Sequence, residues 1–192
     1  MLVLLGIIMC LLIVSCKSSN KTASQTSGSG NPFRDVYEAP CTQHDTDDEF
    51  AATGISNGSR NRMDVLQTAA LTNAQNIVRQ KMQHAYKGAI DDYSNYVGTN
   101  AGSDAVNKVE RAGTQIIDRI VNDTKAVCGP LFSSVDDKGS VDCYIGIRIS
   151  KKQISDAIAD FVSADEELKI RFDEQEFRKR MEESFKKFKE GN

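Results

Sequence analysis

The fold is decided by residues 136–150, DDKGSVDCYIGIRIS. From residue 141 onward every second side chain is apolar up to residue 149, which is the period of a half-buried β-strand. Residues 136–139, upstream of this run, predict a hairpin turn, because Gly139 can adopt a positive φ. A second strand-like run, residues 124–135, precedes the turn, so we predict an antiparallel hairpin. The apolar positions of its second strand are Val141, Cys143, Ile145, Ile147 and Ile149.

Upstream of the hairpin the sequence predicts one strand and a long helix. Residues 50–56, FAATGIS, are typical of a short strand, which Asn57 and Gly58 close. Ser59 can cap a helix through its side-chain oxygen. From Met63 onward apolar residues recur at three- and four-residue spacing over about 35 residues, which predicts an amphipathic helix. The stripe consists of Leu66, Ala70, Ala74, Ile77, Val78, Met82, Ala85, Ala89, Tyr93 and Tyr96.

Further helices are expected on both sides of the hairpin. A loop at residues 98–103 leads into a second helix, whose apolar side contains Val106, Val109, Gly113, Ile116, Ile117 and Ile120. After the hairpin, Ser150 is expected to cap a short helix, and Ser163 is expected to open a last one with Glu166 in the capping-box position. We therefore predict an α+β fold: a small antiparallel three-stranded sheet in the order strand, helix, helix, strand, strand, packed by helices, with amphipathic helices at the C-terminus.

Composition is that of an ordinary globular domain. The chain has 192 residues, of which 40% are hydrophobic and 27% charged, and this excludes a wholly disordered or collagen-like protein. The formal net charge of −3 argues against a protein held to nucleic acid or to anionic lipid by bulk charge. The length allows one domain with appendages.

The N-terminus predicts a lipoprotein signal peptide over residues 1–15. Residues 2–14, LVLLGIIMCLLIV, form an apolar run that is too short to span a membrane. Ser15 and Cys16 follow it, and a small residue before Cys suits a peptidase that frees the Cys amine after its thiol has accepted a diacylglyceryl group. Cys10 is the competing candidate, but Met9 before it is too large. We expect the mature protein to begin at lipidated Cys16; the alternative is an uncleaved signal anchor.

This signal has one departure from the usual pattern, because no Lys or Arg precedes the apolar run. Either the true start lies upstream or the N-terminal amine alone supplies the charge. After Cys16, residues 17–31 contain only small and polar side chains, and we interpret residues 16–31 as the lipid-anchored Cys and a flexible tether. Residues 32–192 then form a single domain that stands off the membrane.

Several short strings of the sequence are characteristic in combination: the segment around Cys16 and residues 38–41 (EAPC), 50–54 (FAATG), 69–74 (AALTNA), 144–151 (YIGIRISK) and 165–173 (DEELKIRFD). Together, in this order, they resemble the Lpp-twenty family of bacterial outer-membrane lipoproteins. The resemblance implies an envelope lipoprotein built on a dodecin-like strand–helix–strand–strand core, and it carries over no catalytic residue. Related domains in flagellar accessory proteins suggest scaffolding. The expected location is the outer membrane of a Gram-negative bacterium, facing the periplasm.

Three further cysteines allow at most one internal disulfide. Cys143 shares a strand face with apolar residues and is expected to be a buried thiol. If residues 137 and 138 centre the turn, Cys128 lies opposite Ile147 and not opposite Cys143. Cys41–Cys128 is therefore the favoured pair, and the alternative is three small buried hydrophobic residues. A nucleophilic Cys acting with one of the two His residues, His44 and His84, has no support in the sequence.

Two other clusters have competing interpretations. Asp45, Asp47, Asp48 and Glu49 could bind calcium, but they lack the Gly and distal Glu of a helix–loop–helix site, so a solvated loop is favoured and no metal or cofactor is expected. The last helix carries an apolar stripe formed by Phe177, Met181, Phe185 and Phe188. This helix either packs on its own domain or presents its stripe to a partner protein or a second copy.

No motif for a phosphate loop, a zinc protease, a dithiol redox site or a serine hydrolase is found. We therefore expect a non-enzymatic, lipid-anchored interaction or structural module. Its expected partners are the membrane, through the anchor, and an envelope protein or a second copy, without nucleic acid. The alternative is a protein that binds a small ligand such as a lipid or a peptidoglycan fragment, and an enzyme is the least supported class.

Overall fold

The computed structural model describes residues 39–97, 103–136, 138–171 and 173–190. The chain divides into two compact units, Met1–Tyr37 and Glu38–Asn192, and all described residues belong to the second. The predicted signal peptide, Cys16 and the tether lie outside the described residues.

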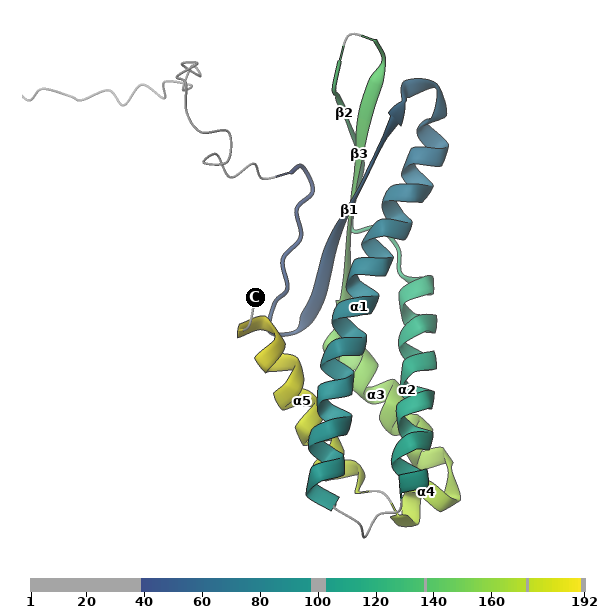
Figure 1. Ribbon diagram of the computed structural model, residues 1–192, viewed down its shortest axis with the longest axis vertical. Coiled ribbons are helices and arrows are strands. Elements are labelled where there is room, and N and C mark those ends of the chain that lie inside the picture. The colour runs from purple at the N-terminus through teal and green to yellow at the C-terminus, as the bar shows by residue number, and fades with distance from the viewer. Residues whose placement is uncertain (1–38, 98–102, 137, 172, 191–192) are drawn as a thin grey trace, which may run out of the picture. The chain divides into compact units, whose positions relative to one another are not determined.

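The sheet is antiparallel and has the strand order β1-β3-β2 (Figure 1). Its strands are β1 (Glu49–Ser59), β2 (Cys128–Ser134) and β3 (Ser140–Ser150). The most regularly alternating run, β3, is the central strand, as expected for a strand that is paired on both sides. The predicted α+β class, with its order of strands and helices, is confirmed.

Three details of the strands differ from the prediction. Strand β2 begins at Cys128, so residues 124–127 of the predicted strand-like run precede it. Strand β1 does not close at residues 57 and 58, because Asn57 pairs with Asp142 and Gly58 with Val141 of β3. In the hairpin the expected register holds at Leu131, which lies opposite Tyr144. An irregularity between residues 128 and 131 then shifts the register by one position, so Cys128 lies opposite Gly146 instead of Ile147.

The helices follow the apolar periodicity. They are α1 (Met63–Val97), α2 (Ser103–Asp123), α3 (Lys151–Ala164), α4 (Glu166–Arg171) and α5 (Glu174–Glu190), with a short 3-10 turn at Arg60–Arg62. Helix α1 has the expected length of 35 residues. The Ser59 and Ser150 hydroxyls accept hydrogen bonds from the backbone N–H groups of Asn61 and Gln153, as their capping positions predict.

The predicted start of the last helix is wrong. Ser163 lies inside α3, and its hydroxyl donates to a carboxylate oxygen of Glu174 at 2.6 Å. The chain instead forms two helices, each preceded by an aspartate. Asp165 accepts a hydrogen bond from the N–H of Leu168, and Asp173 accepts one from the N–H of Glu176, both at 3.0 Å. Each carboxylate satisfies a first-turn donor that has no partner within its own helix.

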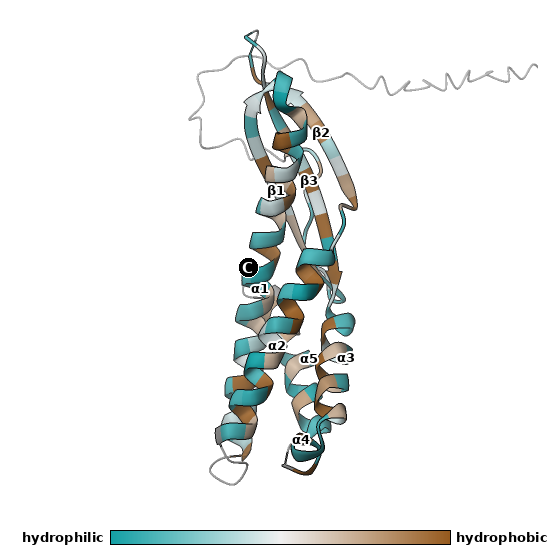
Figure 2. Ribbon diagram, turned by 90° about the vertical axis from the view of Figure 1, so that its right-hand side faces the viewer, coloured by the Kyte–Doolittle hydropathy of each residue, from teal (hydrophilic) through white to brown (hydrophobic). Residues whose placement is uncertain are grey.

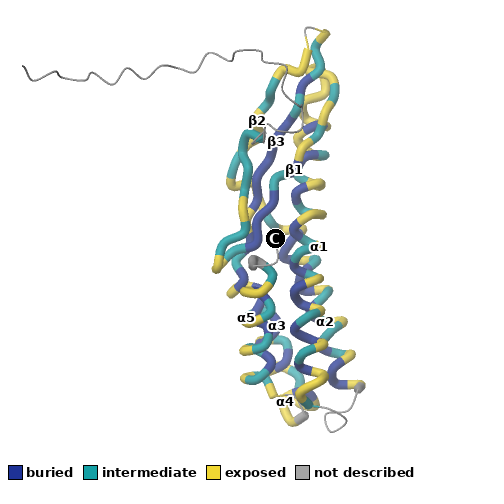
Figure 3. Tube along the Cα trace, turned by 60° about the vertical axis from the view of Figure 1, so that its left-hand side comes forward, coloured by how far each residue is buried: buried dark blue, intermediate teal, exposed yellow. Residues whose placement is uncertain are grey.

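Helix α1 packs on the sheet with one half and on other helices with the other half. Its first half packs on β1 and β3, and its second half packs against α2 and α5, while α3 contacts both α2 and α5 (Figures 1 and 3). The sides of α1 and α2 turned to the viewer in Figure 2 are mainly hydrophilic. The inner face of the sheet is buried and consists of Phe50, Ala52, Gly54, Val141, Cys143, Ile145, Ile147 and Ile149.

No helix among the described residues is long and apolar enough to cross a membrane.

Candidate functional site

The aromatic stripe of α5 is buried in the core of its own domain. Phe177, Met181 and Phe185 are 2%, 0% and 2% exposed. The rings of Phe185 and Phe188 pack edge-on against Phe50, with centroids 5.2 and 5.8 Å away. Of the two interpretations of this helix, the structure shows the one in which it packs on its own domain. Phe177, Met181 and Phe185 are therefore not available as a partner-binding face, because the domain already uses them as core, and Phe188 is partly buried against them.

The structure joins Cys41 to Cys128 by a disulfide, the pair that the sequence favours, with Cα atoms 5.7 Å apart. Cys143 is a free, fully buried thiol, and its burial raises its pKa. A thiol with a raised pKa is a poor nucleophile at neutral pH. The ring of His84 lies edge-on to Phe188.

Residues 41–48, which we call the strap, lie along β1 and fasten it from outside. The Thr53 hydroxyl accepts from the N–H of Gln43 at 2.8 Å and donates to the carbonyl of Cys41 at 3.0 Å. Asp45 accepts from the N–H of Ala51 at 2.7 Å and from the Lys81 ammonium at 2.9 Å. The acidic run thus contributes a structural carboxylate. No group of three or more His, Cys, Asp or Glu that could hold a metal is found among the described residues.

Helix α1 also covers the outer edge of β1. The Asn73 side chain donates to the carbonyl of Ile55 at 2.8 Å, and the Lys81 ammonium donates to the carbonyl of Ala51 at 2.9 Å. These backbone groups would otherwise be open for pairing with another strand. The strap and α1 together therefore protect this edge of the sheet from edge-to-edge association.

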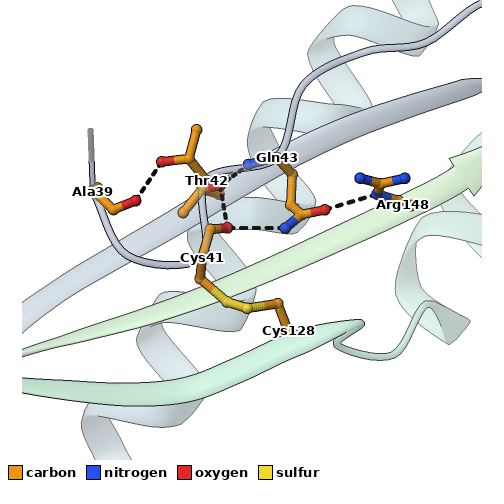
Figure 4. The surroundings of a disulfide bond; sticks show 7 residues. Ala39, Cys41, Thr42, Gln43, Cys128 and Arg148 are labelled. Atoms are coloured by element: carbon orange, nitrogen blue, oxygen red, sulfur yellow. Dashed lines mark hydrogen bonds between the residues drawn. A yellow bond between two sulfur atoms is a disulfide. The ribbon is translucent and has the colours of Figure 1, made fainter. Parts of the chain in front are cut away.

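The strap also positions an arginine at the end of β3 (Figure 4). The Gln43 amide donates to the carbonyl of Cys41 at 3.2 Å and accepts from Nε of Arg148 at 2.7 Å. Nη1 of Arg148 also donates to Glu49 at 3.2 Å. Sequence reasoning missed this arrangement, since Gln43 and Arg148 are far apart in the chain and only the fold brings them together.

Lys151 is a second residue that the sequence did not single out. It is only 6% exposed. Its ammonium donates to the carbonyls of Thr46 at 2.8 Å and Phe185 at 3.0 Å, and lies 5.0 Å from the ring centroid of Phe50. Lys151 thus ties the end of the strap to α5, which explains why a charged side chain can be buried here.

A hollow of about 440 Å³ lies between the end of the strap, the first turns of α3 and the side of α5. Its charged groups include Lys152, Asp156 and Arg178, which are joined in ion pairs. Hydrogen bonds from Lys152 and Arg178 lower the pKa of the Asp156 carboxyl. A second hollow, of about 420 Å³, lies between the end of α2, β3 and α3 and contains Arg148.

Comparisons with protein-family models, curated proteins and solved structures find no match to the chain. A function therefore has to be inferred from its motifs and its geometry.

Proposed function

We propose that the chain is a lipid-anchored lipoprotein of the bacterial cell envelope that acts as a non-catalytic interaction or structural module. The observation that carries this proposal is the apolar run of residues 2–14, followed by Ser15, Cys16 and a small-residue tether. Two or three acyl chains on Cys16 would hold the protein far more firmly than one chain, since each buried CH₂ contributes about 0.8 kcal/mol. The resemblance to the Lpp-twenty family favours the outer membrane, with the domain facing the periplasm.

The Cys41–Cys128 disulfide supports an oxidising compartment, although weakly, because such cross-links persist outside the reducing cytosol. The cross-link joins residues separated by 87 positions. It therefore fastens the beginning of the described domain to the far strand of the sheet. This arrangement suits a domain that is held at its N-terminal side.

A protein partner is expected at β2 instead of α5. The stripe of α5 is buried, whereas exposed apolar side chains occur on β2 and at both of its ends: Val127, Leu131 and Val135. Leu131 on β2 is 45% exposed, and Ile170 on α4 is 86% exposed. These two residues provide a matched pair of surface substitutions, Leu131→Lys and Ile170→Lys, because both replace an exposed apolar side chain.

The proposal is tested by in-cell crosslinking of a C-terminally tagged protein followed by mass spectrometry. We expect one reproducible envelope partner, which is lost in Cys16→Ala and in Leu131→Lys but retained in Ile170→Lys. Failure to find a partner, with the protein still lipidated and abundant, would contradict the interaction role.

The second candidate function is the binding of a small envelope ligand. The observation that favours it is the hollow of about 440 Å³, which falls within the usual range for ligand sites of about 300–1,000 Å³. A thermal-shift series with envelope lipids and peptidoglycan fragments tests this alternative. An unchanged melting temperature with every compound would count against it.

A further inference from the structure

The hollow of about 420 Å³ brings together cationic side chains from three separate elements. Arg119 comes from α2, Lys125 from the link between α2 and β2, and Arg148 from β3. The single carboxylate in its lining is Asp123. The amide of Gln153, in the first turn of α3, adds a neutral donor.

These cations differ from those of the 440 Å³ hollow in how they are used. There, Lys152 and Arg178 are paired with Asp156. The lining of that hollow also holds two further cations, Lys151 and Lys186, and three further carboxylates, Asp47, Asp48 and Glu182, so its charges are balanced in number. In the second hollow, Arg119 and Lys125 form no hydrogen bond or ion pair to another side chain within the described residues. With these two exposed cations and Arg148 against the single carboxylate Asp123, the described lining of the hollow has a positive balance.

Arg148 is held in a defined orientation. Its Nε donates to Gln43 and its Nη1 to Glu49, and neither of these bonds uses Nη2. Gln43 in turn donates to the carbonyl of Cys41, which the disulfide fastens to β2. The guanidinium is thus placed before any ligand arrives, and this lowers the entropic cost of binding.

Helix α3 begins at the same place. It has 14 residues, and Gln153 in its first turn lines the hollow. The positive end of its dipole adds to the field of the three side chains. The helix end only adds to the attraction for an anion, since the three cationic side chains already outnumber the one carboxylate of the lining, Asp123.

We propose that this hollow binds a phosphate group, carried either by a lipid headgroup or by a soluble phosphate compound. Guanidinium groups donate two parallel hydrogen bonds to phosphate oxygens, and an ammonium adds a mobile point charge. Glu49, which pairs with Arg148, and Asp123 offset two of the three positive charges, so the remaining excess suits a phosphate group with a single negative charge. This inference does not depend on the lipid anchor.

The test uses the full chain purified in a neutral detergent at constant ionic strength. Inorganic phosphate is titrated by calorimetry, and hydrogen exchange of residues 119–126 and 148–153 locates the bound anion. The double variant Arg119→Gln/Lys125→Gln should weaken binding about ten-fold or more, as expected for the loss of charge-assisted hydrogen bonds. The control Arg62→Gln/Lys87→Gln removes two exposed cations that do not line the hollow, and should leave binding unchanged.

A second arm distinguishes the two sources of phosphate. Micelles of the neutral detergent that contain phosphatidylglycerol are compared with micelles of the same detergent alone, which carry no phosphate, with the same exchange readout. Protection of residues 119–126 by phosphatidylglycerol identifies a headgroup site, and protection by inorganic phosphate alone identifies a soluble ligand. Absence of protection in both arms, or equal weakening by the control variant, would overturn the proposal.

Discussion

Helix α1 packs by different means in its two halves. On the sheet its buried residues form a narrow row at every fourth position, Leu66, Ala70, Ala74 and Val78. In the helical part it buries larger groups, among them Met82, Tyr86 and Tyr93. The first half therefore brings its backbone close to the sheet, whereas the second half fills space with side chains.

The glycines opposite the two halves show this difference directly. A Cβ atom added to Gly54 of β1 would lie 1.9 Å from the carbonyl oxygen of Ala70. A Cβ atom added to Gly113 of α2 would lie 2.2 Å from the Tyr86 ring. One obstacle is backbone and cannot be removed by substitution, and the other is a side chain that can be exchanged.

The largest effect is expected for Gly54→Ala. The whole helix would have to move away from β1, so we expect a loss of about 4 kcal/mol or more, above the roughly 1–3 kcal/mol of ordinary overpacking. Urea unfolding followed by circular dichroism measures the loss. In the control, Gly139→Ala, the new Cβ meets nothing within 4 Å and only the φ of +90° is strained, so a loss of about 1 kcal/mol is expected. Equal losses in the two variants would contradict the close approach of α1 to the sheet.

Removal of the disulfide should destabilise the sheet more than the part of the domain in which α1 packs against α2 and α5. Cys41→Ser/Cys128→Ser is expected to lower the free energy of unfolding by about 3 kcal/mol, because the unfolded chain without the cross-link regains the entropy of a long loop. Hydrogen exchange should accelerate in β1 and β2 more than in the second half of α1. Uniform acceleration across both halves would show that the cross-link does not act on the sheet in particular.

In the helical half, Gly113→Ala should cost about 2 kcal/mol by overpacking. The Tyr86 hydroxyl donates to the carbonyl of Val109 at 2.7 Å, and burial raises the pKa of this phenol, so it stays protonated. Replacing the ring in Gly113→Ala/Tyr86→Leu should recover part of the loss, which a double-mutant cycle measures. The same cycle applied to Gly54→Ala with Tyr86→Leu should be additive, and coupling there would contradict the division into halves.

The smallest effect is expected for the loss of stability at low pH. Hydrogen bonds from Lys108 and from the N–H of Leu168 lower the pKa of the Asp165 carboxyl, which precedes α4. A lowered pKa means that this stabilisation is complete above the ordinary pKa of 3.8 and is lost as the pH falls through the lowered value. Stability measured between pH 6 and pH 2 should therefore fall less in Lys108→Met than in the unaltered protein. Lys87→Met, in which an exposed lysine of α1 is replaced, is the control and should follow the unaltered protein.

Periodicity alone predicts most of the fold. The three- and four-residue spacing of apolar residues from Met63 onward predicts the length of α1, and the alternation after Gly139 predicts the central strand. Features that depend on backbone partners were not predictable. Strand β1 continues through Asn57 because Asp142 lies opposite it, and the irregularity after Cys128 shifts the hairpin register. In the last helices, Ser163 fits a capping box in sequence, but the aspartates supply the caps.

The candidate sites were less predictable than the fold. The cysteine pair was predictable because Cys143 faces the core and Cys128 does not lie opposite it, although the hairpin register at Cys128 is shifted by one residue from the predicted one. The contacts of Arg148 with Gln43, and of Lys151 with two carbonyls, leave no local signal, since their partners are distant in sequence or are backbone atoms. Gly54 had a signal that could have been used, because a glycine within a strand often marks a close backbone approach, and the alanine-rich start of the following helix is consistent with one.

Lipidation of Cys16 is tested most directly by the mass of the N-terminal peptide of the protein isolated from bacterial membranes. We predict a mature chain that begins at Cys16 and carries a diacylglyceryl group, and a Cys16→Ala variant that lacks this mass and keeps its signal peptide. A chain that retains residues 1–15 with an unmodified Cys16 thiol would contradict the account.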